Sequence, residues 1–273
     1  MKTLETWLIV LGIINIGLFV FGLCVFFPRN VFEKNFQNFY LNLRNQLPYL
    51  ILIFGVVAFH LIEVNFIDPV STKWVGIDFA NNIHSFEEDL VYWFSQNWNP
   101  YLVNFFVIMY IAVYPFTLWF SPLYFLINGE KKSMKNLAYG LLLIYAVALP
   151  FYLFLPVTNV YKFYGLESSL ETVIPSVENF FYTTTTQNNC IPSLHTAMTI
   201  LIARSVFLTG NKLMSYFTIF TMASVLIAVL YLAIHWVTDM IFGAALAIIV
   251  IFLLNHFIDK EKILWQKKLK NKY

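Results

Sequence analysis

Seven stretches of this sequence run without a charged residue, and most of them are long enough to cross a lipid bilayer, which takes about 20 apolar residues in a helix. The runs cover residues 6–28, 45–62, 90–129, 136–161, 179–203, 213–238 and 240–258. Charged residues make up only 12% of the chain and hydrophobic residues 59%, whereas soluble domains carry about 25% charged residues. The sequence therefore excludes a water-soluble globule, a disordered chain, a collagen and a disulfide scaffold, and it predicts an integral membrane protein.

Trimming the polar ends of these runs gives the expected membrane spans. They lie near residues 7–27, 48–67, 100–127, 134–155, 192–209, 213–233 and 236–258. We predict an all-α, polytopic transmembrane helix bundle of about seven spans, with six as the alternative because Pro115 and Pro122 can break the third hydrophobic region. Segment 79–98 is expected to be an amphipathic piece on the membrane surface, with Trp93 and Trp98 at the headgroup level.

The distribution of Lys and Arg predicts the orientation. With the C-terminus inside and seven alternating spans, 14 of the 17 basic residues face the cytoplasm, and only Lys2, Lys73 and Lys162 face outward. The protein is therefore expected in the cell membrane with a cytoplasmic C-terminus, and the loops 68–99 and 156–191 are expected outside. The net charge of +2 gives no reason to expect a nucleic-acid partner.

Two histidines lie where spans begin on the predicted outer side. His195 belongs to the sequence Cys-Ile-Pro-Ser-Leu-His-Thr-Ala, which starts at Cys190, and His235 is followed four residues later by Asp239. Ionisable groups at membrane depth are costly and usually functional. Because residues four apart share a helix face, Asp239 can accept a proton from one imidazole nitrogen and leave the other as a nucleophile or base.

Both motifs are expected at helix N-termini in the same leaflet. Pro192 suits a first helical turn, and the free N–H groups and positive dipole end of such termini attract anions. The spans 192–209 and 213–233 form a hairpin, which returns His235 to the side of the membrane that holds His195. These features predict a phosphate site to which Ser193 donates a further hydrogen bond.

Pro-Ser-Leu-His at 192–195, followed by His235 and Asp239, resembles the type 2 phosphatidic acid phosphatase superfamily, in a motif form closest to its inositol phosphorylceramide synthase-like branch. The resemblance covers roughly residues 140–258. It implies that His235 takes the phosphoryl group as phosphohistidine, that Asp239 orients it, that His195 protonates the leaving oxygen, and that Ser193 binds phosphate.

The sequence also departs from the superfamily pattern. Leu194 stands where the phosphatase branch has Gly, and Val229 stands where it has Arg. The basic first motif is nearly absent, and the residues expected to substitute for it as phosphate ligands are Lys162, Asn159 and Tyr161.

These observations predict three regions: a transmembrane region at 1–133 that includes the outer amphipathic segment, a catalytic transmembrane core at 134–258 in the last four spans, and a basic cytoplasmic tail at 259–273. The predicted function is an integral membrane lipid phosphatase or diphosphatase that acts at the extracytoplasmic face. The expected partners are the bilayer, a lipid phosphate and, if the reaction is a transfer, an alcohol acceptor, with no cofactor and no metal. The oligomeric state is left open.

Three alternatives remain open. The first is a lipid phosphotransferase of the inositol phosphorylceramide synthase type. The second is a transporter or lipid-binding membrane protein that uses the His–Asp pair as a proton relay. The third concerns the site alone and has two forms. Either His195, His235 and Asp239 are three zinc ligands, or the two histidines are buried structural residues whose ring nitrogens bond to backbone carbonyls.

Other polar residues are expected to be structural. His60 and Glu63 are interpreted as an interfacial pair at the outer end of a span, with metal binding as the alternative. His84, Glu87 and Glu88 are interpreted as the solvated face of the surface segment. Cys190 is expected to be inert.

Overall fold

The computed structural model describes residues 4–27 and 38–270, with no side-chain description after His256. The described chain is all-α, as predicted, and its only β feature is an isolated bridge between Val157 and Asn189. The described helices, in chain order, are α1 Leu4–Phe26, α3 Phe39–Ile62, the π-helix η1 Glu63–Ile67, α4 Asp68–Val75, α5 Ala80–Glu87, α6 Leu90–Ser95, α7 Pro100–Ile108, the π-helix η2 Met109–Val113, α8 Tyr114–Asn128, α9 Lys131–Phe154, α10 Val160–Phe163, α11 Ser169–Val173, α12 Val177–Phe181, α13 Leu194–Phe207, α14 Lys212–Tyr231 and α15 Val237–Lys270.

Six described helical stretches are long and apolar enough to cross a membrane. They are Thr6–Phe26, Phe39–Val75, Pro100–Asn128, Lys131–Phe154, Lys212–Tyr231 and Val237–His256. The remaining predicted span, 192–209, corresponds to the shorter apolar helix α13 of 14 residues. The basic tail continues α15 as helix to Lys270, while Arg29 and Lys34, two of the cations used to predict the orientation, lie outside the described residues.

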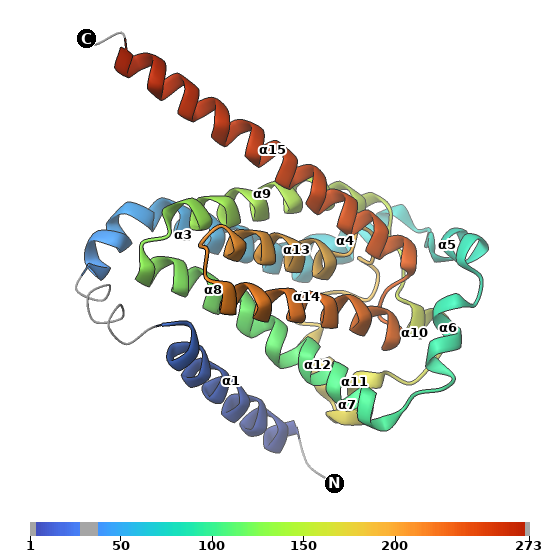
Figure 1. Cartoon of the computed structure of the whole chain (residues 1–273). Helices are drawn as coiled ribbons and strands as arrows, with labels where there is room; N and C mark the ends of the chain where they lie inside the picture. Colours follow the sequence, from blue (N-terminus) through green and yellow to red (C-terminus); the bar gives the residue numbers. More distant parts are fainter. Residues whose placement is uncertain (1–3, 28–37, 271–273) are drawn as a thin grey trace.

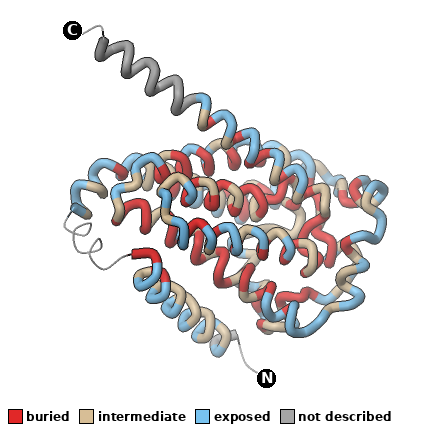
Figure 2. The backbone as a smooth tube through the Cα atoms, viewed as in Figure 1, coloured by how far each residue is buried: buried red, intermediate tan, exposed pale blue. Residues whose placement is uncertain are grey.

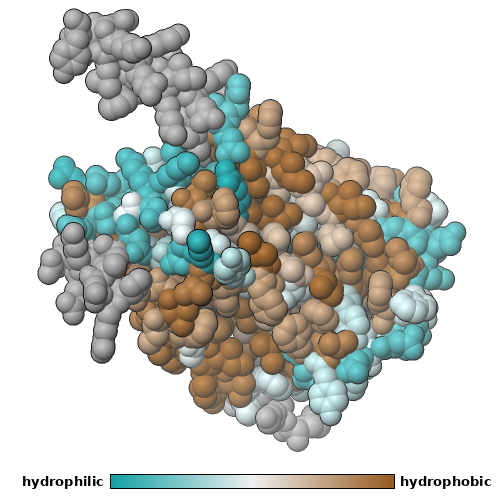
Figure 3. Space-filling model, in the orientation of Figure 1, coloured by the Kyte–Doolittle hydropathy of each residue, from teal (hydrophilic) through white to brown (hydrophobic). Residues whose placement is uncertain are grey.

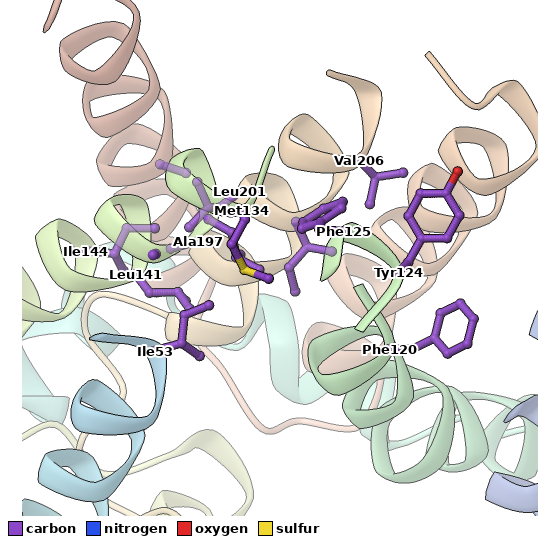
Figure 4. Packing of buried hydrophobic residues seen from close by; sticks show 14 of the residues in the cluster. Ile53, Phe120, Tyr124, Phe125, Met134, Leu141, Ile144, Ala197, Leu201 and Val206 are labelled. Carbon is purple, nitrogen blue, oxygen red and sulfur yellow. The ribbon is translucent and has the colours of Figure 1, made fainter. Parts of the chain in front are cut away.

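Helix α13 lies at the centre of the bundle, where it packs against α9, α14 and α15 (Figure 1). Burial is concentrated in these helices and in α8, whereas α1 lies to one side and exposes most of its surface (Figure 2). Figure 4 shows the core between them. The buried residues labelled there are Ile53, Phe120, Tyr124, Phe125, Met134, Leu141, Ile144, Ala197, Leu201 and Val206. This close-packed, largely apolar core holds α13 in place, and hydrogen bonds from Ser205 to Asn136 of α9 (3.0 Å) and from Arg204 to Asn255 of α15 (3.3 Å) add polar contacts.

The third hydrophobic region is one continuous helical stretch despite its two prolines. The π-helix η2 ends just before Pro115, and Pro122 lies inside α8. A proline ring clashes with the carbonyl four residues earlier in a regular α-helix, and a wider π turn at that point relieves the clash. The same turn carries Tyr110, which contributes to the site described below.

The segment predicted to be amphipathic forms two short helices, α5 and α6, at one end of the bundle (Figure 1). In the face shown in Figure 3, hydrophobic residues cover the middle of the molecule and hydrophilic residues gather toward its ends, including the end with α5 and α6. Trp93 is exposed, whereas Trp98 packs inward and donates a hydrogen bond from Nε1 to the Tyr231 carbonyl (2.7 Å). Trp98 therefore anchors the segment to α14.

Candidate active site

Four side chains from three segments form one hydrogen-bonded chain. The Tyr110 hydroxyl lies 2.9 Å from His195 Nε2, His195 Nδ1 lies 3.3 Å from His235 Nε2, and His235 Nδ1 lies 3.2 Å from Asp239 Oδ2. His235 is 4% exposed and Asp239 and Tyr110 are buried as well. The structure thus brings together the three residues predicted as the reacting group and adds a tyrosine to them.

The chemistry of the two ends gives this chain a direction. A carboxylate only accepts, so His235 Nδ1 carries a proton and donates it to Asp239, which leaves a lone pair on His235 Nε2. His195 Nδ1 then donates to that lone pair, and the Tyr110 hydroxyl donates to His195 Nε2. The tautomers therefore leave His235 Nε2 as the nucleophilic nitrogen and place the exchangeable proton of His195 beside it.

Two helix starts hold the imidazoles against each other. Ser193 is the N-cap of α13, with its side chain accepting a hydrogen bond from Thr196 N (3.3 Å), and Ser193 N donates to the Asp239 carbonyl (3.0 Å). A Cβ on Gly243 would lie 3.1 Å from Thr196 Cβ and closer still to the Ser193 carbonyl oxygen. Glycine at 243 therefore permits the close contact that joins α15 to the start of α13.

The first motif is arranged differently from the prediction in two respects. Pro192 precedes the N-cap and lies outside the first turn, and its carbonyl accepts a hydrogen bond from Tyr152 (2.6 Å). Ser193 is fully buried and does not line the cavity beside the histidines. Its hydroxyl oxygen caps α13, which is the role that Ser most often has at this position.

The N-terminus of α15 is occupied by a carboxylate of the protein. Glu87 accepts hydrogen bonds from Val237 N (2.9 Å) and Thr238 N, and Asp239 Oδ2 accepts one from Trp236 N (2.9 Å). The expectation that this terminus offers free N–H groups to phosphate is therefore wrong. The expectation that Glu87 lies on a solvated face is wrong for the same reason, because Glu87 ties α5 to the helix that carries Asp239.

A cavity of about 520 Å³ opens beside the histidine pair. His195 and His235 lie on its wall, and the rest of the wall is mainly aliphatic and aromatic. The apolar lining residues include Leu8, Leu11, Val56, Val57, Ile111, Leu118, Leu141 and Ile144. Among the described residues that line it there is no Lys and no Arg. A pocket of this size and polarity suits the apolar body of a ligand and orients it through a few polar groups.

The three residues predicted to substitute for the basic first motif lie in different environments. Asn159 is buried, lines the cavity and caps α10 by accepting a hydrogen bond from Lys162 N (3.0 Å). Tyr161 is buried outside the cavity, where its hydroxyl donates to Glu178 (2.7 Å) and burial raises its pKa. Lys162 is exposed and bonds to Gln187. Of the three, only Asn159 faces the cavity.

The described metal-ligating atoms that cluster at this site belong to Cys190, His235 and Asp239, and they lie within 4.8 Å of one another. His195, which the sequence analysis grouped with His235 and Asp239, is not part of that cluster. Burial raises the pKa of the Cys190 thiol, which keeps it in the neutral form that binds metals poorly. Asp239 Oδ2 already accepts two hydrogen bonds, so the carboxylate is arranged to orient His235.

Sequence reasoning missed two residues near the histidines. Tyr110 lies 85 positions from His195 in an apolar run, where nothing distinguishes it from a packing tyrosine, although a π-helix marks the turn that carries it. Glu63 was interpreted as interfacial but is fully buried. Its position inside the second predicted span, 48–67, could have indicated this burial, because a carboxylate within a span has to find partners in the protein.

Glu63 is the centre of a second polar cluster. It accepts hydrogen bonds from the Tyr145 hydroxyl (3.1 Å) and Asn189 Nδ2 (3.1 Å), and His60 Nδ1 lies 3.4 Å away. His60, Tyr145 and Asn189 line the same cavity as His195 and His235. The predicted pairing of His60 with Glu63 is therefore present, but Glu63 is buried and is shared with Tyr145 and Asn189.

The family model described as PAP2 superfamily matches residues 81–253, a range that includes both histidine motifs and the helix carrying Tyr110. No curated protein and no solved structure matches the chain.

Proposed function

Because the chain belongs to the PAP2 superfamily, whose members act on phosphoesters, we propose that it is an integral membrane lipid phosphatase or diphosphatase that works through a phosphohistidine. The observation that carries this proposal is the contact of His195 Nδ1 with His235 Nε2 at 3.3 Å beside a largely apolar cavity. A nucleophile, a proton donor and space for a lipid then lie together.

The proposed reaction has two steps, the formation of the phosphohistidine and its hydrolysis. In the first, His235 Nε2 forms a bond to phosphorus while the bond from phosphorus to the leaving oxygen breaks, and that oxygen takes the proton of His195 Nδ1. In the second, a water oxygen bonds to phosphorus as the P–N bond breaks, and the water proton passes to His195. Asp239 stabilises the charge on His235 while the intermediate exists.

The cavity supports a lipid as substrate. Its apolar wall reaches α1, α3 and α9, which are among the stretches that can span a membrane. An acyl chain lying there would remain in an apolar environment while the phosphate meets the histidines. We also propose that this site faces the extracytoplasmic side of the cell membrane, an orientation that rests on the distribution of Lys and Arg.

The test is phosphate release by the purified full-length protein from phosphatidic acid and lipid diphosphates. We expect His235→Ala to abolish release and to lose the acid-labile phosphoryl label that the wild type acquires. His256→Ala, an exposed position near the other end of the membrane-spanning part of α15, is the matched control. Wild-type release by His235→Ala, or a label that survives in it, would refute the nucleophile assignment.

A second candidate is a lipid phosphotransferase of the inositol phosphorylceramide synthase type. The observation that favours it is the lack of Lys and Arg among the described lining residues. Phosphoryl transfer from a dianionic monoester needs cations or strong donors around the phosphate oxygens, whereas a diester carries one negative charge and needs fewer. The mass of the product formed with and without an added alcohol distinguishes the two. Hydrolysis gives free phosphate from phosphatidic acid and the headgroup phosphate from a diester, whereas transfer gives a new phosphoester that contains the added alcohol.

A further inference from the structure

His60, Tyr145 and Asn189 form one wall of the cavity, and the buried carboxylate of Glu63 lies behind them. Glu63 has no exposed surface, and both of its carboxylate oxygens accept: Oε1 from Asn189 and Oε2 from Tyr145. No described Lys or Arg forms an ion pair with it, and the only described basic side chain within 4 Å of its carboxylate is His60, at 3.4 Å. A buried carboxylate held this way is costly, and it begins a π-helix, a feature common at functional sites.

This arrangement fixes the hydrogen-bonding character of the wall. The single proton of the Tyr145 hydroxyl and an amide proton of Asn189 point to Glu63, because a carboxylate can only accept. His60 Nε2 lies 3.1 Å from the Thr184 carbonyl oxygen, so this ring nitrogen already has a hydrogen-bond partner within the protein. The Tyr145 oxygen therefore keeps free lone pairs, and Asn189 Oδ1 has no partner. This wall offers acceptors, and the groups that it can bind are donors.

An acceptor wall backed by a negative charge does not suit phosphate, whose oxygens are acceptors and carry the same charge. The phosphate is instead favoured at the histidine end of the cavity. We propose that His60, Tyr145 and Asn189, polarised by Glu63, form a subsite for a hydroxyl group, either on the headgroup of the lipid or on an alcohol that accepts the phosphoryl group. This inference rests on the proposed function, because it gives the subsite a place in the same reaction.

The two possible sources of the hydroxyl share one chemistry. An acceptor alcohol bound here would reach the phosphohistidine across the cavity: its oxygen would bond to phosphorus as the bond to His235 Nε2 breaks, and its proton would pass to His195. A headgroup hydroxyl would instead orient the lipid before the first step. Thr184, Thr185 and Thr186 also line the cavity, and the hydroxyls of Thr185 and Thr186 can donate to the ligand oxygen, whereas the Thr184 hydroxyl donates to the Phe181 carbonyl (2.9 Å).

The first measurement uses the full-length protein with phosphatidic acid as donor and glycerol as added alcohol, and it compares glycerol phosphate with free phosphate. Glu63→Gln puts an amide donor where the acceptor was and turns the polarity of Tyr145 and Asn189 toward the cavity. We expect the ratio of glycerol phosphate to free phosphate to fall about tenfold in this variant and in Tyr145→Phe, the effect of losing one good hydrogen bond. Tyr139→Phe, on the outward face of the same helix, should leave the ratio as in the wild type.

The second measurement does not need turnover. In a His235→Ala background, phosphatidylglycerol is expected to raise the unfolding temperature more than phosphatidylpropanol does, because the latter has the same charge but no headgroup hydroxyl, and adding Glu63→Gln should remove that difference. A loss in the first measurement alone identifies the acceptor alcohol as the source, and a loss in the second alone identifies the headgroup. Unchanged results in both, an equal effect of Tyr139→Phe, or stronger protection by phosphatidylpropanol would overturn the proposal. Inactivity of the wild type toward every donor would instead refute the proposed function, while the lipid-binding difference would still decide the subsite.

Discussion

Gly243→Ala tests whether the contact between α15 and the start of α13 creates the site. The added Cβ would lie 3.1 Å from Thr196 Cβ and 3.2 Å from the Ser193 carbonyl carbon, and nearer to the Ser193 oxygen than to either. These are mostly backbone or β-carbon atoms, which cannot rotate away as the end of a long side chain can. The overlap is relieved only if α13 and α15 separate.

The change in the free energy of unfolding follows from two opposing effects. Overpacking a closely packed contact costs about 1–3 kcal/mol, and alanine regains up to about 1 kcal/mol over glycine as a helix former. The net destabilisation is therefore small, on the order of 1 kcal/mol. Activity should fall much further, because His195 follows Ser193 by two residues, and a shift of about 1 Å in a reacting group costs about 100-fold in rate.

The assay pairs thermal unfolding with phosphate release for three variants. Gly12→Ala and Gly55→Ala place the same methyl group where nothing lies within 4 Å, so both should keep their activity and their unfolding temperature or gain slightly. Gly243→Ala should lower the unfolding temperature by a few degrees and activity about 100-fold. If Gly243→Ala behaves like the two controls, the close contact does not determine the catalytic geometry.

Three further predictions concern the surroundings of the histidines. Tyr110→Phe should reduce turnover about 10- to 100-fold, because it leaves His195 Nε2 buried without its hydrogen-bond donor. Tyr114→Phe is the control and should change turnover less than threefold, because the Tyr114 hydroxyl has only a 3.8 Å contact with the Met198 sulfur. Equal losses in the two variants would contradict the role of Tyr110. Glu87→Gln should keep one acceptor for the N-terminus of α15 but lose its charge, lowering the unfolding free energy by about 1 kcal/mol, and an unchanged denaturation midpoint would argue against this cap. A cysteine at the exposed position Glu167 should react with an impermeant reagent added outside intact cells, and protection from it would reverse the predicted orientation.

Hydrophobicity and short-range spacing decided the features that could be predicted from the sequence. Long apolar runs have to become helices in a bilayer, because every backbone polar group there has to be paired within the protein, so the all-α membrane bundle followed directly. The four-residue interval between His235 and Asp239 predicted their pairing, although His235 lies just before α15 and Asp239 lies in the first turn of that helix. The motif at 192–195 added the likeness to a family, which the match over residues 81–253 confirms.

Only the tertiary structure decided which other side chains reach this pair. Tyr110 arrives from another helix, Glu87 fills the helix terminus that the sequence reserved for phosphate, and Glu63 faces the cavity wall from a third segment. Each contact joins residues more than 80 positions apart. Periodicity and motif spacing describe neighbours within one helix, whereas contacts between helices depend on their rotation and depth, which close packing sets through residues such as Gly243 that carry no chemistry of their own.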